Sequence, residues 1–403
     1  MKKNIKILYG VQGEGRGHAS RSLHILNNLK TRGYDVQIFS GGDALPLLED
    51  LDLPVQIIPL FRLHYGRRGI SLIQTVMKNL TLSLGLLLRF GRKYKTVFST
   101  IKTFQPDVII SDFEPYLCRI GGYLKIPVIS LDHQHNVLTS DIPHLNKLSH
   151  KIKHRVFQFG IRLLYGNPEK LIVSSFFHFP KKAGSSAEFV GPFIPEEFNR
   201  ISTNSTHDHV TIYLKEPAYI NHIISSLRDK REIRFEIFSN WDRIEVREPI
   251  PGNVSLHNID RKRFLHSLVN ADALVSTAGN QVIGEAAFLG IPVLAFPKKN
   301  DFEQEINGIA LNESGFGCSL PLNEFNTNSL DAFMGKIPVY RENIRQFMSA
   351  ESSYDGVERT INIVTQSIDE FLRSRQVIFE ISFGKVRLTY LRNLTGYKLN
   401  LIY

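Results

Sequence analysis

The chain has 403 residues, of which 42% are hydrophobic and 22% are charged, and its net charge is +10. This length predicts two domains, each with a sizeable core, and the composition excludes a disordered or membrane-spanning chain. The longest nearly apolar run, Leu80 to Leu88, is shorter than the ~20 residues of a transmembrane helix. No signal peptide is expected. Only two cysteines occur, Cys118 and Cys318, and they indicate a reducing cytoplasm rather than a disulfide framework.

The positive charge lies in the first half of the chain. Residues 1–190 contain 26 Lys and Arg against 13 Asp and Glu, and no acidic residue occurs between Asp52 and Asp107 or between Asp141 and Glu169. Basic residues in these stretches are interleaved with Leu, Ile and Phe, which fits an anionic membrane surface. Nucleic acid is the competing partner, and a solvated face is the third interpretation. We favour a membrane surface or a lipid-linked acceptor and expect no nucleic acid.

The first half alternates strand-like and helical segments, which predicts a parallel sheet with crossover helices. Strands are expected at residues 5–11, 35–40, 55–58, 107–111, 126–131 and 170–175, and helices at about 19–32, 70–104 and 151–165. Residues 191–208 contain two prolines followed by a run rich in Ser, Thr and Asn. They are predicted to link two domains.

The second half repeats this pattern. Strands are expected at residues 210–214, 234–238, 273–275 and 292–296, and helices between them and at 303–314, 325–334 and about 354–373. Residues 376–403 alternate like a β-hairpin that turns at Gly384. This segment either contacts a membrane or partner or packs on a domain edge.

A small-residue turn at residues 276–279 leads into a helix that carries Glu285. Backbone N–H groups at such a helix start favour phosphate, because the unpaired donors and the helix dipole both point at the anion. A carboxylate one to two turns into the helix can accept both hydroxyls of a ribose. An apolar strand and a polar loop follow, ending at Asp301, Gln304 and Asn307. This order suits a nucleoside diphosphate.

These motifs resemble the donor site of B-type glycosyltransferases, especially the family-28, peptidoglycan N-acetylglucosaminyltransferase and UDP-glucuronosyltransferase branch. Gly290, Pro292 and Pro297 match its strand motif, and Asp301, Gln304 and Asn307 match its D-x-x-Q-x-x-N helix start. The resemblance implies that Ser276, Thr277, Ala278 and Gly279 contact the diphosphate, that Glu285 contacts the ribose, and that Asp301 and Gln304 contact the sugar.

The fold implied by this resemblance is α/β, with two Rossmann-like domains that face a cleft. Residues 1–192 would form the acceptor domain and residues 209–350 the nucleotide-sugar domain. The helix at 354–373 would cross back to the first domain, and residues 376–403 would be an additional segment. One departure is that the first strand of the second domain is followed by no Gly-rich turn, so Lys215 could supply positive charge there.

The loop after the first strand, GVQGEGRGHASR at residues 10–21, lies at the edge where α/β sheets bind ligands. Its glycines let a substrate approach the backbone, and Gly15, Arg16 and Gly17 are predicted to contact the acceptor. His18 is suited to be the base that deprotonates the attacking hydroxyl, and the resemblance implies that Asp112 orients it. His18 could instead contact the acceptor or a phosphate, or simply begin the helix. Arg16 and Arg21 could hold an anionic group of the acceptor.

The segment LDHQHN at residues 131–136 follows another strand at the same edge. By resemblance to the acceptor cleft of the peptidoglycan branch, His133, Gln134 and Asn136 are predicted to contact the acceptor. A zinc site built from Asp132, His133 and His135 is the alternative, although adjacent residues of one loop seldom converge on one ion.

We therefore expect an inverting glycosyltransferase that moves a sugar from a nucleotide diphosphate, with UDP as the nucleotide, and needs no metal or cofactor. Its acceptor would be presented at the inner face of the cytoplasmic membrane. One alternative is a UDP-sugar 2-epimerase of the same fold. The other is a noncatalytic basic protein that binds lipid or nucleic acid.

Overall fold

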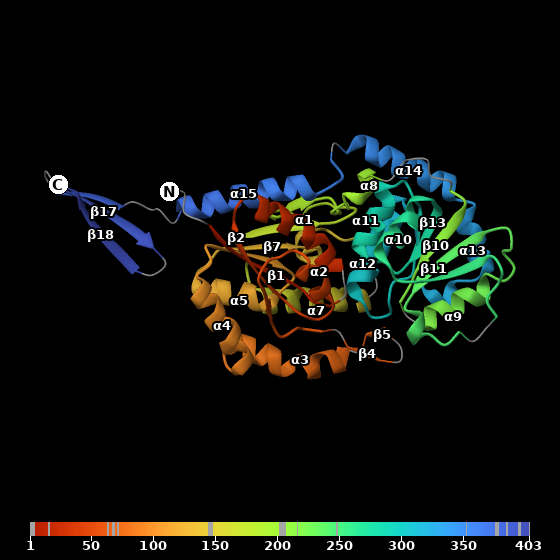
Figure 1. The fold of residues 1–403 in the computed structure, drawn as a ribbon, viewed down its shortest axis with the longest axis horizontal. Helices are drawn as coiled ribbons and strands as arrows, with labels where there is room; N and C mark the ends of the chain where they lie inside the picture. The colour runs from red at the N-terminus through yellow and green to blue at the C-terminus, as the bar shows by residue number, and fades with distance from the viewer. Residues whose placement is uncertain are drawn as a thin grey trace.

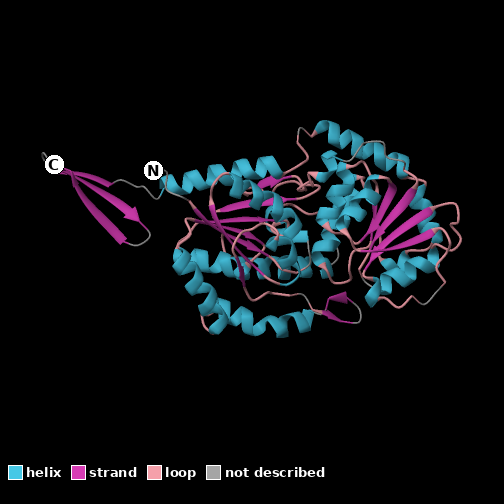
Figure 2. Cartoon of the chain, in the orientation of Figure 1, coloured by secondary structure: helices cyan, strands magenta, loops and turns pink. Residues whose placement is uncertain are grey.

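Two parallel β-sheets organise this protein, whose computed structural model describes residues 5–14, 17–62, 64–66, 69–70, 72–143, 148–200, 207–215, 217–246, 249–351, 353–374, 379–383, 386–393 and 396–402. Helices cover both sheets (Figures 1 and 2). All strand pairs in the two sheets are parallel. The predicted α/β class with two Rossmann-like domains is confirmed.

The first sheet has seven strands in the order β3-β2-β1-β6-β7-β8-β9. They are β1 (Lys6–Val11), β2 (Asp35–Ser40), β3 (Val55–Ile57), β6 (Val108–Asp112), β7 (Val128–Asp132), β8 (Lys170–Ser174) and β9 (Glu188–Val190). Every residue of β6 and β7 is buried. Such continuous burial is expected in parallel strands that helices cover on both faces.

The helices of the first domain are α1 (Gly17–Thr31), α2 (Leu45–Glu49), α3 (Leu72–Leu87), α4 (Arg92–Phe104), α5 (Pro115–Leu124), α6 (Asn136–Thr139) and α7 (Leu148–Tyr165). The predicted helix at residues 70–104 is in fact two helices, α3 and α4. The chain turns between them because Arg89 and Gly91 have φ of 59° and 89°, values outside the right-handed helical region. A two-stranded ribbon, β4 (Tyr65–Gly66) and β5 (Gly69–Ile70), precedes α3.

The second sheet has six strands in the order β12-β11-β10-β13-β14-β15. They are β10 (His209–Tyr213), β11 (Arg234–Ser239), β12 (Val254–Asn258), β13 (Ala271–Ser276), β14 (Val293–Ala295) and β15 (Gly317–Ser319). The helices are α9 (Pro217–Ser226), α10 (Arg261–Val269), α11 (Asn280–Phe288), α12 (Phe302–Ser314), α13 (Thr327–Met334) and α14 (Ile337–Ala350). The edge strands β12 and β15 were not predicted from the sequence.

The chain crosses between the domains twice, and the two crossings touch. The first follows β9 and includes the short helix α8 (Glu197–Arg200), and the second leads from α14 into α15 (Val357–Ser374). The Gly356 amide donates to the Pro192 carbonyl at 2.9 Å. A Cβ atom at Gly191 would overlap the Tyr354 carbonyl, and one at Gly356 would overlap the Gly191 carbonyl. The two backbones therefore pack directly against each other.

Helix α15 covers the core of the first domain. Its Ile361, Val364 and Ile368 are buried in one cluster with Ile25 of α1 and Ile7 of β1. Figure 1 shows α15 lying along this domain, beside α1. Residues at the end of the chain thus complete the core that the first strand begins.

The last described segments form a three-stranded antiparallel sheet instead of the predicted two-stranded hairpin. Its strands are β16 (Phe379–Phe383), β17 (Val386–Asn393) and β18 (Gly396–Ile402). This sheet stands apart from both domains in Figure 1. Gly384, where the turn was predicted, lies outside the described residues. Among the described helices, none has the length and hydropathy needed to cross a bilayer.

Candidate functional site

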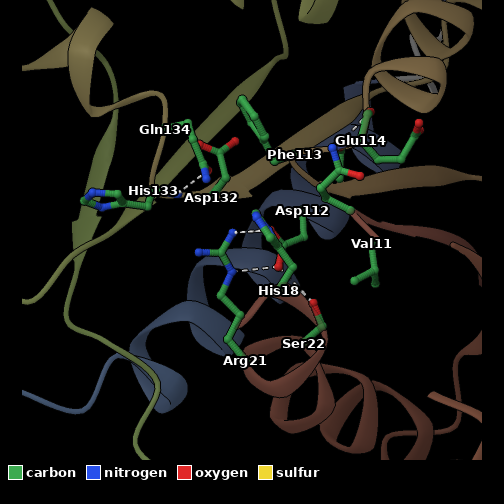
Figure 3. Close-up of polar contacts among 12 residues, drawn as sticks. Val11, His18, Arg21, Ser22, Asp112, Phe113, Glu114, Asp132, His133 and Gln134 are labelled. Atoms are coloured by element: carbon green, nitrogen blue, oxygen red, sulfur yellow. Dashed lines mark hydrogen bonds and ion pairs between the residues drawn. The ribbon is translucent and has the colours of Figure 1, made fainter. Parts of the chain in front are cut away.

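The carboxyl ends of neighbouring strands bring the predicted catalytic and acceptor residues to one edge of the first sheet (Figure 3). Asp112 ends β6 and Asp132 ends β7, and these strands are parallel neighbours. His18 lies in the first turn of α1, which follows β1. This is the edge at which α/β sheets bind ligands.

His18 and Asp112 are in direct contact, although 94 residues separate them. The His18 Nδ1 lies 2.7 Å from one carboxylate oxygen of Asp112. Arg21 donates from Nε to the other oxygen at 2.7 Å and also contacts the first oxygen through Nη2. Ser22 donates its hydroxyl to the carboxylate at 3.0 Å. Arg21 was predicted to hold an anionic acceptor group, but its side chain is buried against Asp112.

The ionised carboxylate of Asp112 favours one tautomer of His18. Burial alone would raise the pKa of Asp112, but the charges of Arg21 and then His18 hold it below its ordinary value. An ionised carboxylate can only accept hydrogen bonds, so in the contact with Asp112 the proton belongs to His18 Nδ1. Arg21 Nη2 also lies 2.9 Å from this nitrogen. The Nε2 of neutral His18 is then the basic nitrogen. His18 keeps 16% of its side chain exposed, whereas Asp112 is fully buried.

The glycines of the loop before α1 serve different purposes. A Cβ atom at Gly13 would overlap the Gly41 carbonyl, and one at Gly10 would press against Leu117. These two glycines are therefore required by packing within the protein. A Cβ atom at Gly17 would meet nothing within 4 Å, which leaves open space at the start of α1. Gly15 and Arg16, both predicted acceptor contacts, lie outside the described residues.

The predicted acceptor residues of the β7–α6 segment contact three different partners. Gln134 donates to Glu303 of α12 at 2.9 Å, and His133 Nε2 lies 2.7 Å from the Asn307 carboxamide oxygen. Both contacts join the two domains. The carboxamide oxygen of Asn136 instead accepts from the Ser140 hydroxyl within the first domain.

The side chains of the alternative zinc site are engaged separately. Asp132 accepts from Ser130 at 2.6 Å and lies 2.7 Å from His135 Nδ1, whereas His133 contacts the other domain. Burial would raise the pKa of Asp132, but His135 and the hydrogen bonds outweigh it and lower the pKa to about 2. Within the described ranges, no group of three His, Cys, Asp or Glu side chains could hold a metal ion.

The predicted diphosphate turn links β13 to α11 in the second domain. Ser276 is buried and donates its hydroxyl to the Tyr213 carbonyl at 3.0 Å, and Ala278 is also buried. Thr277 and Gly279 are partly exposed. Gly279 is the N-cap of α11, and no side chain caps this helix start. The first N–H groups of α11 therefore have no side-chain acceptor, which is the arrangement that favours an anion.

Glu285 lies on α11 and is closed off from solvent. Its carboxylate accepts from Gln281 at 3.1 Å and lies 3.8 Å from the Arg261 guanidinium of α10. Gln281 also donates to the Phe193 carbonyl of the interdomain crossing at 2.6 Å. Burial raises the pKa of Glu285, and Arg261 only partly offsets this. Gln281 occupies one oxygen of this carboxylate, and an ionised carboxylate can accept further hydrogen bonds at its other oxygen.

Asp301 and Gln304 close the start of α12. Asp301 caps the helix by accepting from the Gln304 amide at 3.2 Å, and the Gln304 side chain accepts from the Lys298 amide at 3.0 Å. Burial and then the charge of Glu303 raise the pKa of Asp301 to about 7. Both predicted sugar contacts thus also order the loop that holds them.

Sequence reasoning missed Asn280, the first residue of α11. Its carboxamide oxygen lies 3.2 Å from the Ser175 hydroxyl and 3.2 Å from the Phe176 amide, both in the first domain. An Asn directly after a small-residue turn was the only available signal, and it does not identify partners 104 and 105 residues away.

The model of a family described as glycosyl transferase family 1 matches residues 5–338. An uncharacterized glycosyltransferase from Methanosarcina acetivorans is 25% identical over 384 residues, which cover 90% of this chain and 99% of that protein. A UDP-N-acetylglucosamine–N-acetylmuramyl-(pentapeptide) pyrophosphoryl-undecaprenol N-acetylglucosamine transferase from Blochmanniella floridana is 20% identical over 388 residues, covering 93% of this chain and 100% of that enzyme.

Solved structures with the same fold are also glycosyltransferases. The glycotransferase of kitacinnamycin has a TM-score of 0.65 at 16% identity, and the match covers 90% of this chain and 99% of the other. VinC in complex with DTDP has a TM-score of 0.60 at 12% identity, covering 91% and 100%. MurG from Acinetobacter baumannii has a TM-score of 0.54 at 14% identity, covering 90% and 99%. The resemblance to B-type glycosyltransferases that the donor motif predicted is confirmed.

Proposed function

Because this chain belongs to glycosyl transferase family 1 and is a glycosyltransferase, we propose that it transfers a sugar from a nucleoside diphosphate, with inversion and without a metal ion. We propose UDP as the nucleotide and a membrane-presented molecule as the acceptor. The observation that carries the proposal is the His18–Asp112 contact at the edge of the first sheet, together with the uncapped start of α11 in the second domain.

The proposed reaction is a single displacement. His18 Nε2 takes the proton of the acceptor hydroxyl, while Asp112 holds the Nδ1 proton and stabilises the imidazolium that forms. The acceptor oxygen bonds to the anomeric carbon from the side opposite the diphosphate. The bond from that carbon to the phosphate oxygen breaks, and its electron pair leaves with the diphosphate. Attack from the opposite side inverts the anomeric configuration.

The leaving diphosphate would be stabilised by the turn at residues 276–279 and the N–H groups that begin α11. Unpaired backbone donors and the helix dipole stabilise the developing negative charge without a metal ion. Glu285 would accept the ribose hydroxyls, and Asp301 and Gln304 would contact the sugar. Two of the structural neighbours, VinC and a spinosyn rhamnosyltransferase, were solved with thymidine diphosphate, which supports a nucleoside diphosphate as the ligand.

The support for a membrane-presented acceptor comes from α7. Leu148, Ile152, Val156, Phe159 and Leu163 are 37 to 72% exposed and follow one another at intervals of three or four residues, so they form one apolar face. Exposed Lys151, Arg155 and Arg162 belong to the same helix. An apolar face with flanking cations is the pattern of a helix that lies in an anionic membrane surface.

The position of α7 connects this face to the site. Lys153 of α7 forms an ion pair with Glu305 of α12 at 2.6 Å, and Phe157 packs against Phe302. Helix α12 also carries the predicted sugar contact Gln304. A membrane that binds α7 would thus lie near the contact between the domains, where the proposed site would receive a lipid-linked acceptor.

The donor is tested first by thermal unfolding with UDP, dTDP, GDP and NAD, since a ligand of the folded state raises the midpoint by mass action. We expect UDP to raise it and NAD to have no effect. Transfer is then measured as labelled sugar moved from UDP-sugars to a lipid extract. His18→Gln should bind UDP but transfer no sugar. Stabilisation by NAD alone, or epimerisation of the donor without any acceptor, would refute the proposal.

Membrane binding is tested by sedimentation with phosphatidylcholine vesicles that contain or lack phosphatidylglycerol. We expect binding only to the anionic vesicles. Two double variants should lose this binding: one removes apolar side chains (Ile152→Ser with Phe159→Ser), and the other reverses charges (Arg155→Glu with Arg162→Glu). The control Val339→Ser removes an equally exposed apolar side chain from α14 of the other domain and should bind normally. Retention of binding in both double variants, or salt-sensitive binding to RNA instead of vesicles, contradicts the membrane proposal.

A further inference from the structure

A set of buried hydrogen bonds joins the two domains next to the turn at residues 276–279. Its side chains are His133 from the first domain and Asn280 and Asn307 from the second, and each is at most 6% exposed. The Asn307 carboxamide lies between the Ala278 carbonyl, to which it donates at 2.9 Å, and His133 Nε2, at 2.7 Å from its oxygen. One side chain thus touches both the predicted donor turn and the predicted acceptor loop.

The Ser174 carbonyl at the end of β8 completes this set. His133 Nδ1 lies 3.0 Å from this oxygen, and Asn280 donates to it at 3.3 Å. A carbonyl only accepts, so His133 Nδ1 donates to it. Asn280 immediately follows Gly279 and holds one end of the turn, while Asn307 holds the turn at Ala278. Both side chains also contact the first domain, Asn280 at Ser174 and Asn307 at His133.

The orientation of Asn307 is fixed by its neighbours. Turning the carboxamide over would place its oxygen against the Ala278 carbonyl, which is also an acceptor. With the nitrogen facing Ala278, the oxygen faces His133 Nε2. In this closed arrangement both ring nitrogens of His133 lie against acceptor oxygens. A side chain without two donors in this geometry cannot make both contacts.

We propose that His133, Asn280 and Asn307 form a latch that couples the conformation of the donor turn to closure of the two domains. This inference rests on the proposed function for the position of the donor, and it assigns positioning roles to residues that need not touch the nucleotide. A buried polar group left without its partner costs ~1–3 kcal/mol, so the closed state and the ordered turn stabilise each other. Linkage then requires that closure strengthens nucleotide binding and that nucleotide binding favours closure.

The test measures UDP affinity by isothermal titration of the full chain. His133→Phe removes the contact between the first domain and Asn307 and should weaken UDP binding roughly 5- to 150-fold, the range of typical coupling between sites. Asn307→Asp nearly preserves the size of the side chain but places an oxygen against the Ala278 carbonyl, and it should weaken binding similarly. The double variant should bind no more weakly than the weaker single variant, because both act through one contact.

The matched control is Lys153→Met. It breaks another contact between the domains, the ion pair with Glu305, but it does not touch the turn. Its UDP affinity should stay within twofold of the parent. Parental affinity in both His133→Phe and Asn307→Asp, with parental circular dichroism, would overturn the latch. An equal loss in Lys153→Met would overturn it as well, since any interdomain contact would then suffice.

A second measurement separates this inference from the proposed donor. Small-angle scattering should show a larger radius of gyration for His133→Phe than for Lys153→Met, and hydrogen exchange should be faster at residues 278–283. If the parent bound no nucleotide, the proposed function would fail, and these two measurements alone would decide on the latch. Unchanged scattering and exchange in His133→Phe would then refute it.

Discussion

Replacing Asp112 by Asn should separate its two possible roles, a counter-ion for Arg21 and an orienter for His18. Asp112 is fully buried and accepts from His18, Arg21 and Ser22. Asn keeps the shape but removes the charge, and its nitrogen cannot accept. Arg21, with only 7% of its side chain exposed, is then a buried cation that has lost its paired carboxylate. Breaking such a pair costs ~3–5 kcal/mol, whereas removing both charges is often close to neutral.

We therefore expect Asp112→Asn to lower the free energy of unfolding by ~3–5 kcal/mol. The double variant Arg21→Met, Asp112→Asn should recover most of this loss. Urea unfolding at pH 7 measures this. Far-ultraviolet circular dichroism follows the unfolding of both domains. The fluorescence of Trp241, the single tryptophan, reports on the second domain, so the midpoint that it gives should change less.

Activity should not recover with stability. In the double variant His18 has lost its carboxylate acceptor, so the transfer rate should remain ~10²–10⁴-fold below the parent, the usual contribution of general base catalysis. A double variant that is stable and transfers sugar at the parental rate would show that Asp112 only neutralises Arg21. The assignment of His18 as an oriented base would then be wrong.

Three further predictions concern other parts of the site. Gly13→Ala should lose ~1–3 kcal/mol of stability or more, because the added methyl group overpacks against Gly41. Gly17→Ala places its methyl group in open space and should unfold like the parent in the same urea assay. Equal losses of stability in the two variants would contradict this. Because the pKa of Asp132 is lowered to about 2, its stabilisation is present above pH ~4 and is lost as the pH falls toward 2. This contribution is roughly 2 kcal/mol, and Asp132→Asn should abolish it. Acid unfolding curves that run parallel for the parent and for Asp132→Asn would refute the prediction. The pKa of Glu285 is raised, so ionisation of this carboxylate opposes folding as the pH rises above its ordinary value. Glu285→Gln should therefore remove that pH-dependent loss of stability yet weaken UDP binding about tenfold, and parental affinity in titration would argue against the ribose contact.

The sequence predicted what depends on short-range patterns. The apolar runs of β1, β6 and β13 and the small-residue turn before α11 are local signals, so they identified the strands and the site edge. The three-residue strand β15 is too short to show alternation, and it was missed for that reason. The break between α3 and α4 depends on a left-handed Arg89 that propensity alone does not reveal.

Contacts between distant residues could not be predicted in the same way. The glycines before α1 were expected to admit a substrate, yet Gly13 is required by Gly41, which is a neighbour only after the sheet has formed. Arg21 is three residues from His18, but its burial depends on Asp112 at the end of another strand. Partner choices of buried polar groups follow from tertiary packing, and a single sequence does not contain that geometry.

The contact of Gly191 with Gly356 means that the two chain segments that cross between the domains pack against each other and form one hinge. The segment that leaves the first domain is pressed against the segment that returns to it, so rotation there must carry both backbones together. A bulky residue at either glycine would push the connections apart and take α15 with them. Residues 353–374 therefore belong to the hinge between the domains, and removing them would both expose the apolar core of the first domain and release that hinge.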